Sequence, residues 1–154
     1  SQLQVESRGS AHIRSADPAA PPAIRYNYLA TEKDRRVVVE GLQLIRRICG
    51  TSPMREHVLG EYMPGEQVAS DEDWLAYCRE MGETVFHPTS TCSIGPVVDA
   101  ALKVRGVQGL RVVDASVMPT MLSANLNAAT MMIAEKASDM IRGRAPAEAA
   151  VLPA

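Results

Sequence analysis

The chain has 154 residues, of which 46% are hydrophobic and 22% are charged, and this composition fits one soluble globular unit or parts of two. A net charge of −2, with no cluster of Lys and Arg, argues against a nucleic-acid partner. No apolar run approaches the roughly 20 residues that a helix needs to cross a bilayer, so we expect no membrane span.

The first residues and the cysteines bear on the cellular setting. The chain starts at Ser1, without an initiator Met or a signal-peptide pattern, so we expect it to begin inside a longer gene product. Cys49, Cys78 and Cys92 are odd in number and widely spaced, which predicts reduced thiols and a cytoplasmic location. A zinc site with His87 and Cys92 would need two more ligands, and His12 and His57 show no paired spacing, so we predict no metal site.

The first part of the chain predicts a short strand, a connector and a helix. Residues 7–15 alternate weakly, which favours a strand, and the proline-rich segment 17–22 breaks regular structure. Thr31, followed three residues later by Asp34, is a favourable helix start, and Gly50 is a favourable end. The expected buried face of this helix consists of Val38, Leu42, Ile45 and Cys49.

A second helix is predicted between Ser70 and Gly82. Ser70 is a good N-cap, and the acidic residues after it suit the positive end of the helix dipole. Trp74, Cys78 and Met81 recur on one face, which we expect to be its packed face.

Short strands are expected after this helix. Residues 84–86 predict a strand that delivers His87, and Pro88 restricts the backbone of His87 to extended conformations. Residues 102–106 and 110–114 predict two further strands that meet at a glycine-containing turn.

A third helix is predicted over residues 128–141. Its broad apolar face predicts that it is deeply packed rather than lying on the surface. That face consists of Met131, Met132, Ile133, Ala134, Ala137, Met140 and Ile141.

Four polar residues could carry chemistry. His87 is the candidate general acid or base, which we expect to be buried, although a lone histidine more often has a structural role. Asn125 and Asn127 stand at the start of the third helix, where one is expected to cap it, and where the helix start could also hold an anion. Asp114 ends a predicted strand beside the small residue Ala115, a position that suits either ligand binding or a turn. The residues alone thus indicate a ligand-binding α+β piece with one candidate base and no defined reaction.

Short motifs follow one another through residues 5–143. They are His87-Pro-x-x-Thr91-Cys92-x-x-Gly95, Val97-Val98-Asp99, the run from Leu102 to Ser116, and Asn125-x-Asn127-Ala128 leading to Ala134-Glu135-Lys136, with Ser7-Arg8-Gly9-Ser10, Asn27-Tyr28-Leu29 and Pro64-Gly65 upstream. In this order they resemble the C-terminal region of the glucose–methanol–choline (GMC) family of FAD-dependent oxidoreductases.

The resemblance implies an α+β fold that is the C-terminal piece of a two-domain flavoenzyme. Residues 1–84 would be a portion of the substrate-binding domain, with a sheet segment and helices. Residues 85–143 would be the return strands and helix of the FAD-binding domain, and residues 144–154 a tail. The dinucleotide-binding βαβ unit of the family is missing, so the N-terminal FAD-binding part of the same enzyme is the expected partner.

The resemblance also implies a reaction and its residues. In the family an alcohol is oxidised to a carbonyl while hydride passes to flavin N5. By position, His87 looks like the base that takes the hydroxyl proton, and Asn125 looks like its partner. The expected contacts with FAD are Phe86, His87, Asp114, Ala115, Leu126 and Asn127.

Some positions depart from the family pattern, and other functions stay open. Ala129 stands where the family often has proline, while Ser90 and Ser93 stand where glycine and a basic residue are common, which bears on substrate preference. One alternative is a flavin-containing lyase, such as a hydroxynitrile lyase, in which His87 does acid–base work without net redox. The other is a non-catalytic module derived from the family.

Overall fold

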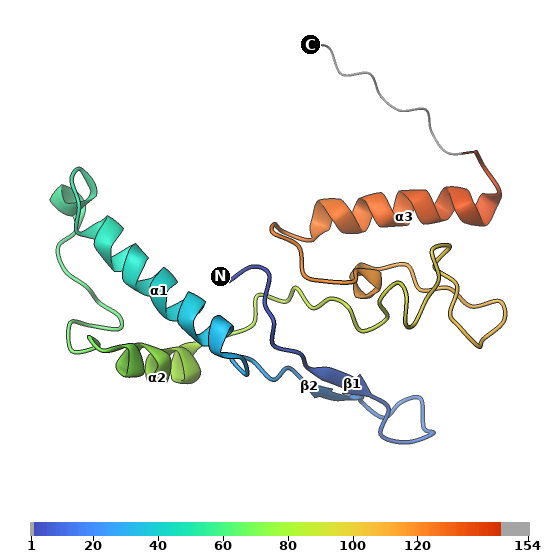
Figure 1. Cartoon of the computed structure of the whole chain (residues 1–154), viewed down its shortest axis with the longest axis horizontal. Coiled ribbons are helices and arrows are strands. Elements are labelled where there is room, and N and C mark those ends of the chain that lie inside the picture. Colours follow the sequence, from blue (N-terminus) through green and yellow to red (C-terminus); the bar gives the residue numbers. More distant parts are fainter. Residues whose placement is uncertain (1, 146–154) are drawn as a thin grey trace, which may run out of the picture. The chain divides into compact units, whose positions relative to one another are not determined.

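The computed structural model describes residues 2–145, which form two compact units that divide between Val85 and Phe86 (Figure 1). This division lies beside the boundary expected from the sequence, and the assignment of the units to a substrate domain and an FAD domain stays a prediction. Of the tail expected over 144–154, residues 146–154 lie outside the described residues. None of the described helices is long and apolar enough to cross a membrane.

Unit 1 begins with a two-stranded antiparallel sheet. Strand β1 (Ser10–His12) pairs with β2 (Ala23–Arg25), with Ser10 opposite Arg25. The strand expected over 7–15 is therefore confirmed but short, and β2 was not predicted. Gly9 lies so close to the carbonyl oxygen of Arg25 that a Cβ would collide with it, which explains glycine at the entry to β1.

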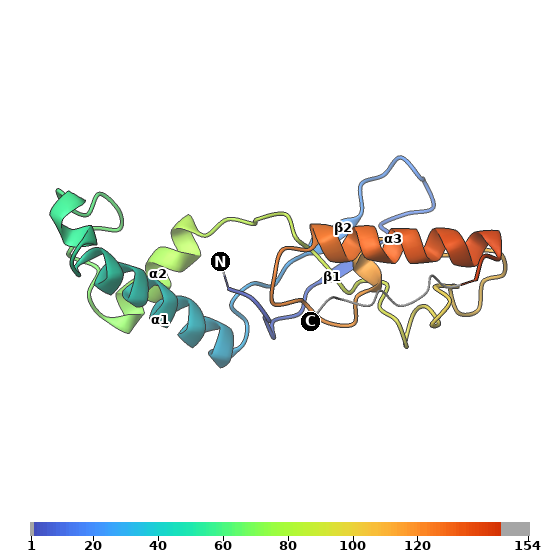
Figure 2. The ribbon, with the colours of Figure 1, turned by 90° about the horizontal axis from the view of Figure 1, so that it is seen from above.

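The two helices predicted for unit 1 are confirmed. Helix α1 (Glu32–Cys49) has Thr31 as its N-cap, whose side chain accepts from the Asp34 amide, and ends at Gly50. Helix α2 (Asp71–Met81) starts at Ser70 with a reciprocal capping box to Asp73. A short 3₁₀ turn, η1 (Met54–His57), follows α1, and the two α-helices lie side by side in both views (Figures 1 and 2).

Trp74 and Arg46 join α1 to α2. The Trp74 side chain is buried, and the Arg46 guanidinium lies 4.1 Å from the centre of its ring, a cation–π contact. Arg46 also pairs with Glu61 at 2.9 Å and donates to the Val68 carbonyl at 2.6 Å. Of the predicted packed face of α1, Val38, Leu42 and Cys49 are partly buried and Ile45 is 56% exposed. Val39, which was not predicted, is buried.

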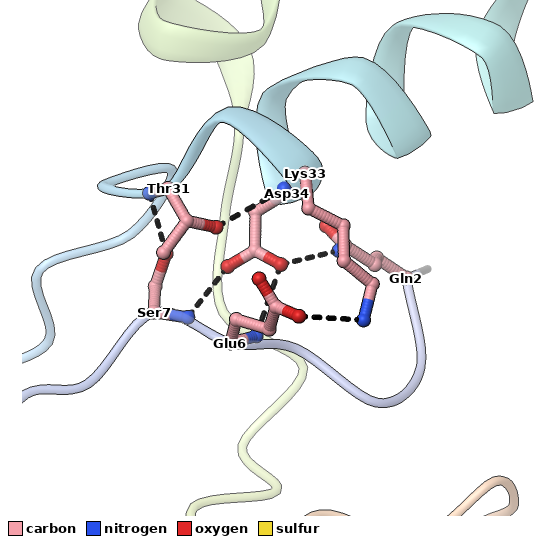
Figure 3. A network of polar contacts seen from close by, with 6 residues as sticks. All are labelled: Gln2, Glu6, Ser7, Thr31, Lys33 and Asp34. Carbon is pink, nitrogen blue, oxygen red and sulfur yellow. Dashed lines mark hydrogen bonds and ion pairs between the residues drawn. The ribbon is translucent and has the colours of Figure 1, made fainter.

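A buried carboxylate fixes the start of α1 to the first residues of the chain (Figure 3). Asp34 is 1% exposed and accepts from the Ser7 amide at 2.7 Å, the Glu6 amide at 3.0 Å and the Gln2 side chain at 2.8 Å. The Ser7 hydroxyl in turn accepts from the Thr31 amide at 3.3 Å. These hydrogen bonds to the Asp34 carboxylate hold residues 2–7 against the start of α1.

Unit 2 consists of a turn-rich segment with helix α3 (Asn127–Arg142) beside it, as Figures 1 and 2 both show. A 3₁₀ turn, η2 (Ala115–Val117), lies between them in sequence. The core of the unit is small and is formed by Val98, Leu102, Val117 and Ala137.

The strands predicted for this unit are wrong in extent. Residues 102–106 and 110–114 meet only at the isolated bridge between Lys103 and Arg111, with one further bridge from Val98 to Val104. No strand forms over residues 84–86, where Phe86 has a left-handed φ of 58°. Glycine turns and left-handed residues interrupt the extended backbone, so no continuous β-ladder forms between these segments.

Helix α3 is also less buried than predicted. Met131, Met132 and Ile141 are each more than half exposed, and Ala137 is the one buried residue among those of α3. The expectation of deep packing on a broad face is therefore wrong within this unit, because the small core covers a single stripe of the helix.

Candidate active site

A hollow of about 450 Å³ in unit 2 gathers most of the residues predicted from the sequence. It is formed by three chain segments: the loop that begins at Phe86, the η2 turn, and the start of α3. Six of the seven predicted site residues line it, namely Phe86, His87, Asp114, Ala115, Leu126 and Asn127.

The loop that carries His87 has an irregular backbone. Phe86 has φ 58° and Ser90 has φ 73°, so two non-glycine residues in the left-handed region flank His87, Pro88 and Thr89. His87 is exposed in unit 2, so the expectation of a buried imidazole is wrong here. His87 is one of the residues that line the hollow.

Asp114 is used within its own turn. Its side chain caps η2 by accepting from the Ser116 amide at 2.8 Å, which is the turn-forming arrangement that the sequence left open. The same turn holds the loop after His87, since the Cys92 amide donates to the Ser116 carbonyl at 3.0 Å. Asp114 therefore shapes the hollow by fixing the backbone of η2. It is also one of the residues that line the hollow.

The start of α3 differs from the prediction. The N-cap position is Leu126, which has no side-chain cap hydrogen bond, and Asn127 is the first residue of the helix. The expectation that Asn125 or Asn127 caps α3 is therefore wrong, because the helix starts one residue later than an Asn125 cap would require and one earlier than an Asn127 cap would. Leu126 is buried, and its carbonyl accepts from the Thr130 amide at 2.9 Å and the Thr130 hydroxyl at 2.8 Å.

Asn125 is the predicted residue that is not brought to the hollow. It is exposed, two residues before α3, and is not among the residues that line the hollow. The assignment of Asn125 as partner of His87 remains a prediction.

Three hydroxyl-bearing residues line the hollow although they were not among the predicted site residues: Thr91, Ser116 and Thr130. Thr130 lies three residues after Asn127, and residues at this spacing share a helix face. Thr130 could have been predicted from its helical spacing to Asn127. Thr91 and Ser116 belong to the motifs around His87 and Asp114.

The lining of the hollow is partly apolar and partly polar. Phe86, Ala115 and Leu126 provide apolar surface, while His87 and Asn127 provide groups that can donate or accept hydrogen bonds. Among residues 2–145, no three His, Cys, Asp or Glu side chains come together as metal ligands would. Cys49, Cys78 and Cys92 are free in the structure.

Comparison with known proteins identifies the family. The sequence profile described as GMC oxidoreductase matches residues 5–134. An oxygen-dependent choline dehydrogenase of Staphylococcus aureus is 44% identical over 153 residues, which cover 95% of this chain and 27% of that protein.

Solved structures agree in fold. An FAD-dependent oxidoreductase from Chaetomium thermophilum has a TM-score of 0.83 and 34% identity, covering 92% of this chain and 25% of its own. A fungal aryl-alcohol oxidase has a TM-score of 0.78 and 34% identity, covering 90% of this chain and 24% of its own. The chain thus spans about a quarter of the length of these relatives. With a matching profile over most of its length, this chain belongs to the GMC oxidoreductase family.

Proposed function

We propose that this chain is the C-terminal part of an FAD-dependent enzyme that oxidises an alcohol CH–OH group to a carbonyl, with His87 as the general base. The observation that carries the proposal is the hollow of unit 2, which gathers His87, the η2 turn and the start of α3. The named activities of a choline dehydrogenase and an aryl-alcohol oxidase among the relatives support an alcohol as the substrate class.

The residues of the hollow fit part of the cofactor. A volume of about 450 Å³ lies within the range of small-molecule sites and suits a ring system, with Phe86, Ala115, Leu126 and Asn127 as the residues that would hold it. The rest of a dinucleotide would be held by the N-terminal FAD-binding part of the enzyme, our proposed partner. When bound, FAD would supply the acceptor for the hydride that leaves the alcohol carbon.

His87 would act on the substrate hydroxyl. His87 lines the hollow and is exposed, and its imidazole would accept the hydroxyl proton, which would make the oxygen-bearing carbon a better hydride donor. Asn125, exposed just before α3, would orient the substrate oxygen through its amide without competing for the proton.

The test is His87→Gln in the flavin-loaded holoenzyme that contains this chain. Glutamine keeps a polar side chain but cannot take up a proton at neutral pH, so we expect the rate of anaerobic flavin bleaching by choline or benzyl alcohol to fall by about 10²–10⁴-fold. The matched control is His57→Gln, at an exposed residue of η1, which should leave the rate unchanged.

The outcomes separate the candidate functions. Bleaching at the wild-type rate in His87→Gln would remove His87 as the base. A wild-type holoenzyme that processes a cyanohydrin without bleaching would instead indicate the lyase reaction, and a holoenzyme that binds no flavin would indicate a non-catalytic module.

A further inference from the structure

The chain that follows His87 is fixed to the η2 turn at two points. The Cys92 amide donates to the Ser116 carbonyl at 3.0 Å, and the Ile94 amide donates to the Val117 carbonyl at 2.9 Å. Within the described part of the chain, neither His87 nor any residue between it and Cys92 makes a backbone–backbone hydrogen bond. The path of the chain from the fixed Cys92 back to His87 therefore depends on the backbone torsions of the residues between them.

Ser90 has the unusual torsion of this stretch. Its φ of 73° lies in the left-handed region, which residues other than glycine adopt uncommonly, and it stands where the related family often has glycine. Pro88 has a φ fixed by its ring, which leaves fewer torsions free to change. Ser90 belongs to unit 2, so its torsion acts inside one compact unit. A different φ at Ser90 would send the chain towards His87 along another path.

The side chain of Ser90 makes only a local hydrogen bond among the residues that the structure describes. Its hydroxyl donates to the hydroxyl of the preceding residue, Thr89, at 3.1 Å. A bond between sequence neighbours adds no link from this loop to η2 or α3. The left-handed backbone is therefore the feature of Ser90 that bears on the path of the loop.

We propose that Ser90 is a positioning residue for His87, and that it acts through its left-handed backbone rather than through its hydroxyl. This inference rests on the proposed function, in which His87 is the base. His87 and Pro88, before Ser90, and Thr91, after it, all line the same hollow. The torsion at Ser90 sets where the first two lie relative to Thr91 and the η2 turn.

Two pairs of substitutions separate the backbone of Ser90 from its hydroxyl. Ser90→Gly and Ser90→Asn remove the hydroxyl, and both residue types adopt the left-handed region more readily. Ser90→Thr keeps the hydroxyl but is β-branched, like Ser90→Val, and β-branched residues are outliers at positive φ. The measurement is the rate of anaerobic flavin reduction at saturating choline or benzyl alcohol, together with KM and the pH profile, in the flavin-loaded holoenzyme that contains this chain.

We expect the Gly and Asn variants to keep the wild-type reduction rate and the Thr and Val variants to be about 10- to 100-fold slower, since a misplacement of about 1 Å can cost about 100-fold. KM and flavin content should differ little among the four, and the pH dependence attributed to His87 should persist in the Gly variant. Ser15→Thr is the matched control, at an exposed serine whose φ is not positive, and should leave the rate unchanged.

A Thr variant as fast as the wild type beside a slow Gly variant would assign the role to the hydroxyl and overturn the proposal, as would equal rates in all four variants. If the β-branched variants do not retain flavin, the Gly and Asn variants decide: wild-type rates in both support the proposal, and a fall of about 10-fold or more in both overturns it.

The His87→Gln variant measured alongside separates the two claims. A fully active His87→Gln enzyme removes the proposed function itself. An inactive His87→Gln enzyme, together with equal rates in the four Ser90 variants, removes only the positioning role of Ser90.

Discussion

Asp34 shows how a single residue organises unit 1. Burial acts to raise the pKa of its carboxyl, but hydrogen bonds from the Ser7 hydroxyl, the Glu6 and Ser7 amides and the Gln2 side chain outweigh burial and lower the pKa from 3.8 to about 2. Because the folded pKa lies below the unfolded one, the ionised carboxylate stabilises the fold above the unfolded pKa. That stability is lost as the pH falls from about 4 towards 2.

Asp34→Asn should therefore destabilise the start of α1 near neutral pH. A pKa lowered from 3.8 to about 2 corresponds to about 2 kcal/mol of stabilisation by the charged form. Hydrogen exchange at the Glu6 and Ser7 amides should be faster in the variant at pH 5, and the difference from the wild type should shrink as the pH approaches 2. The control is Asp17→Asn, at an exposed carboxylate that accepts from the Ala19 amide. If the difference in exchange rate between Asp34→Asn and the wild type stayed the same from pH 5 to pH 2, the lowered pKa of Asp34 would be contradicted.

At the scale of elements, the caps decide where the helices of unit 1 start. Ser70 accepts from the Asp73 amide at 3.2 Å, and the Asp73 carboxylate accepts from the Ser70 amide at 3.0 Å. The Ser70 hydroxyl also holds the pKa of Asp73 below its usual value.

Ser70→Ala should lower the free energy of unfolding by about 1 kcal/mol, because the first turn of α2 loses its cap. Ser70→Gly is the matched variant, since glycine at an N-cap costs only a few tenths of a kcal/mol. Urea denaturation of the holoenzyme measures both, and an unchanged free energy of unfolding in Ser70→Ala would show that the hydroxyl does not cap α2.

The packed stripe of α3 can be tested in the same way. Ala137 is 1% exposed and lies in the core with Val98 and Val117, so Ala137→Leu should overpack that core and destabilise by about 1–3 kcal/mol. Lys136→Leu places the same side chain at the exposed neighbouring position and should cost far less. A comparison of the two melting temperatures checks which stripe is packed.

At the scale of the whole molecule, each unit holds few buried apolar residues. Among residues 2–145 the buried ones are Val39, Trp74, Val98, Leu102, Val117, Met118, Leu126 and Ala137. Units of this size rarely gain more than a few kcal/mol from one core, and a two-stranded sheet such as β1–β2 is marginally stable by itself.

Residues 1–154 expressed alone should therefore unfold with a shallow, weakly cooperative denaturant curve and should bind apolar dyes. Exposed apolar side chains on both units, such as Ile48 on α1 and Met131 on α3, provide the surface for the dye. Supplying the proposed N-terminal FAD-binding part with FAD should steepen the curve and reduce the dye signal. A steep, single, flavin-free transition of the isolated chain would contradict the expectation.

The helices were predictable because their signals are local. Thr31 with Asp34, and Ser70 with Asp73, lie within one helical turn, so the sequence places both caps without knowledge of the fold. The order of motifs around His87, Asp114 and Asn127 likewise predicted six residues that the structure brings to one hollow.

What the sequence by itself determined is the family and the starts of α1 and α2, because each depends on neighbours a few positions apart or on the order of motifs. Only the tertiary structure decided that β2 pairs with β1, that one stripe of α3 is packed, and that Asn125 does not line the hollow. The left-handed backbone at Phe86 was also known only from the structure, because a bulky residue normally avoids positive φ and the sequence does not predict it. The strand pairing and the packed stripe of α3 depend on contacts between segments far apart in the chain, which local propensity does not contain.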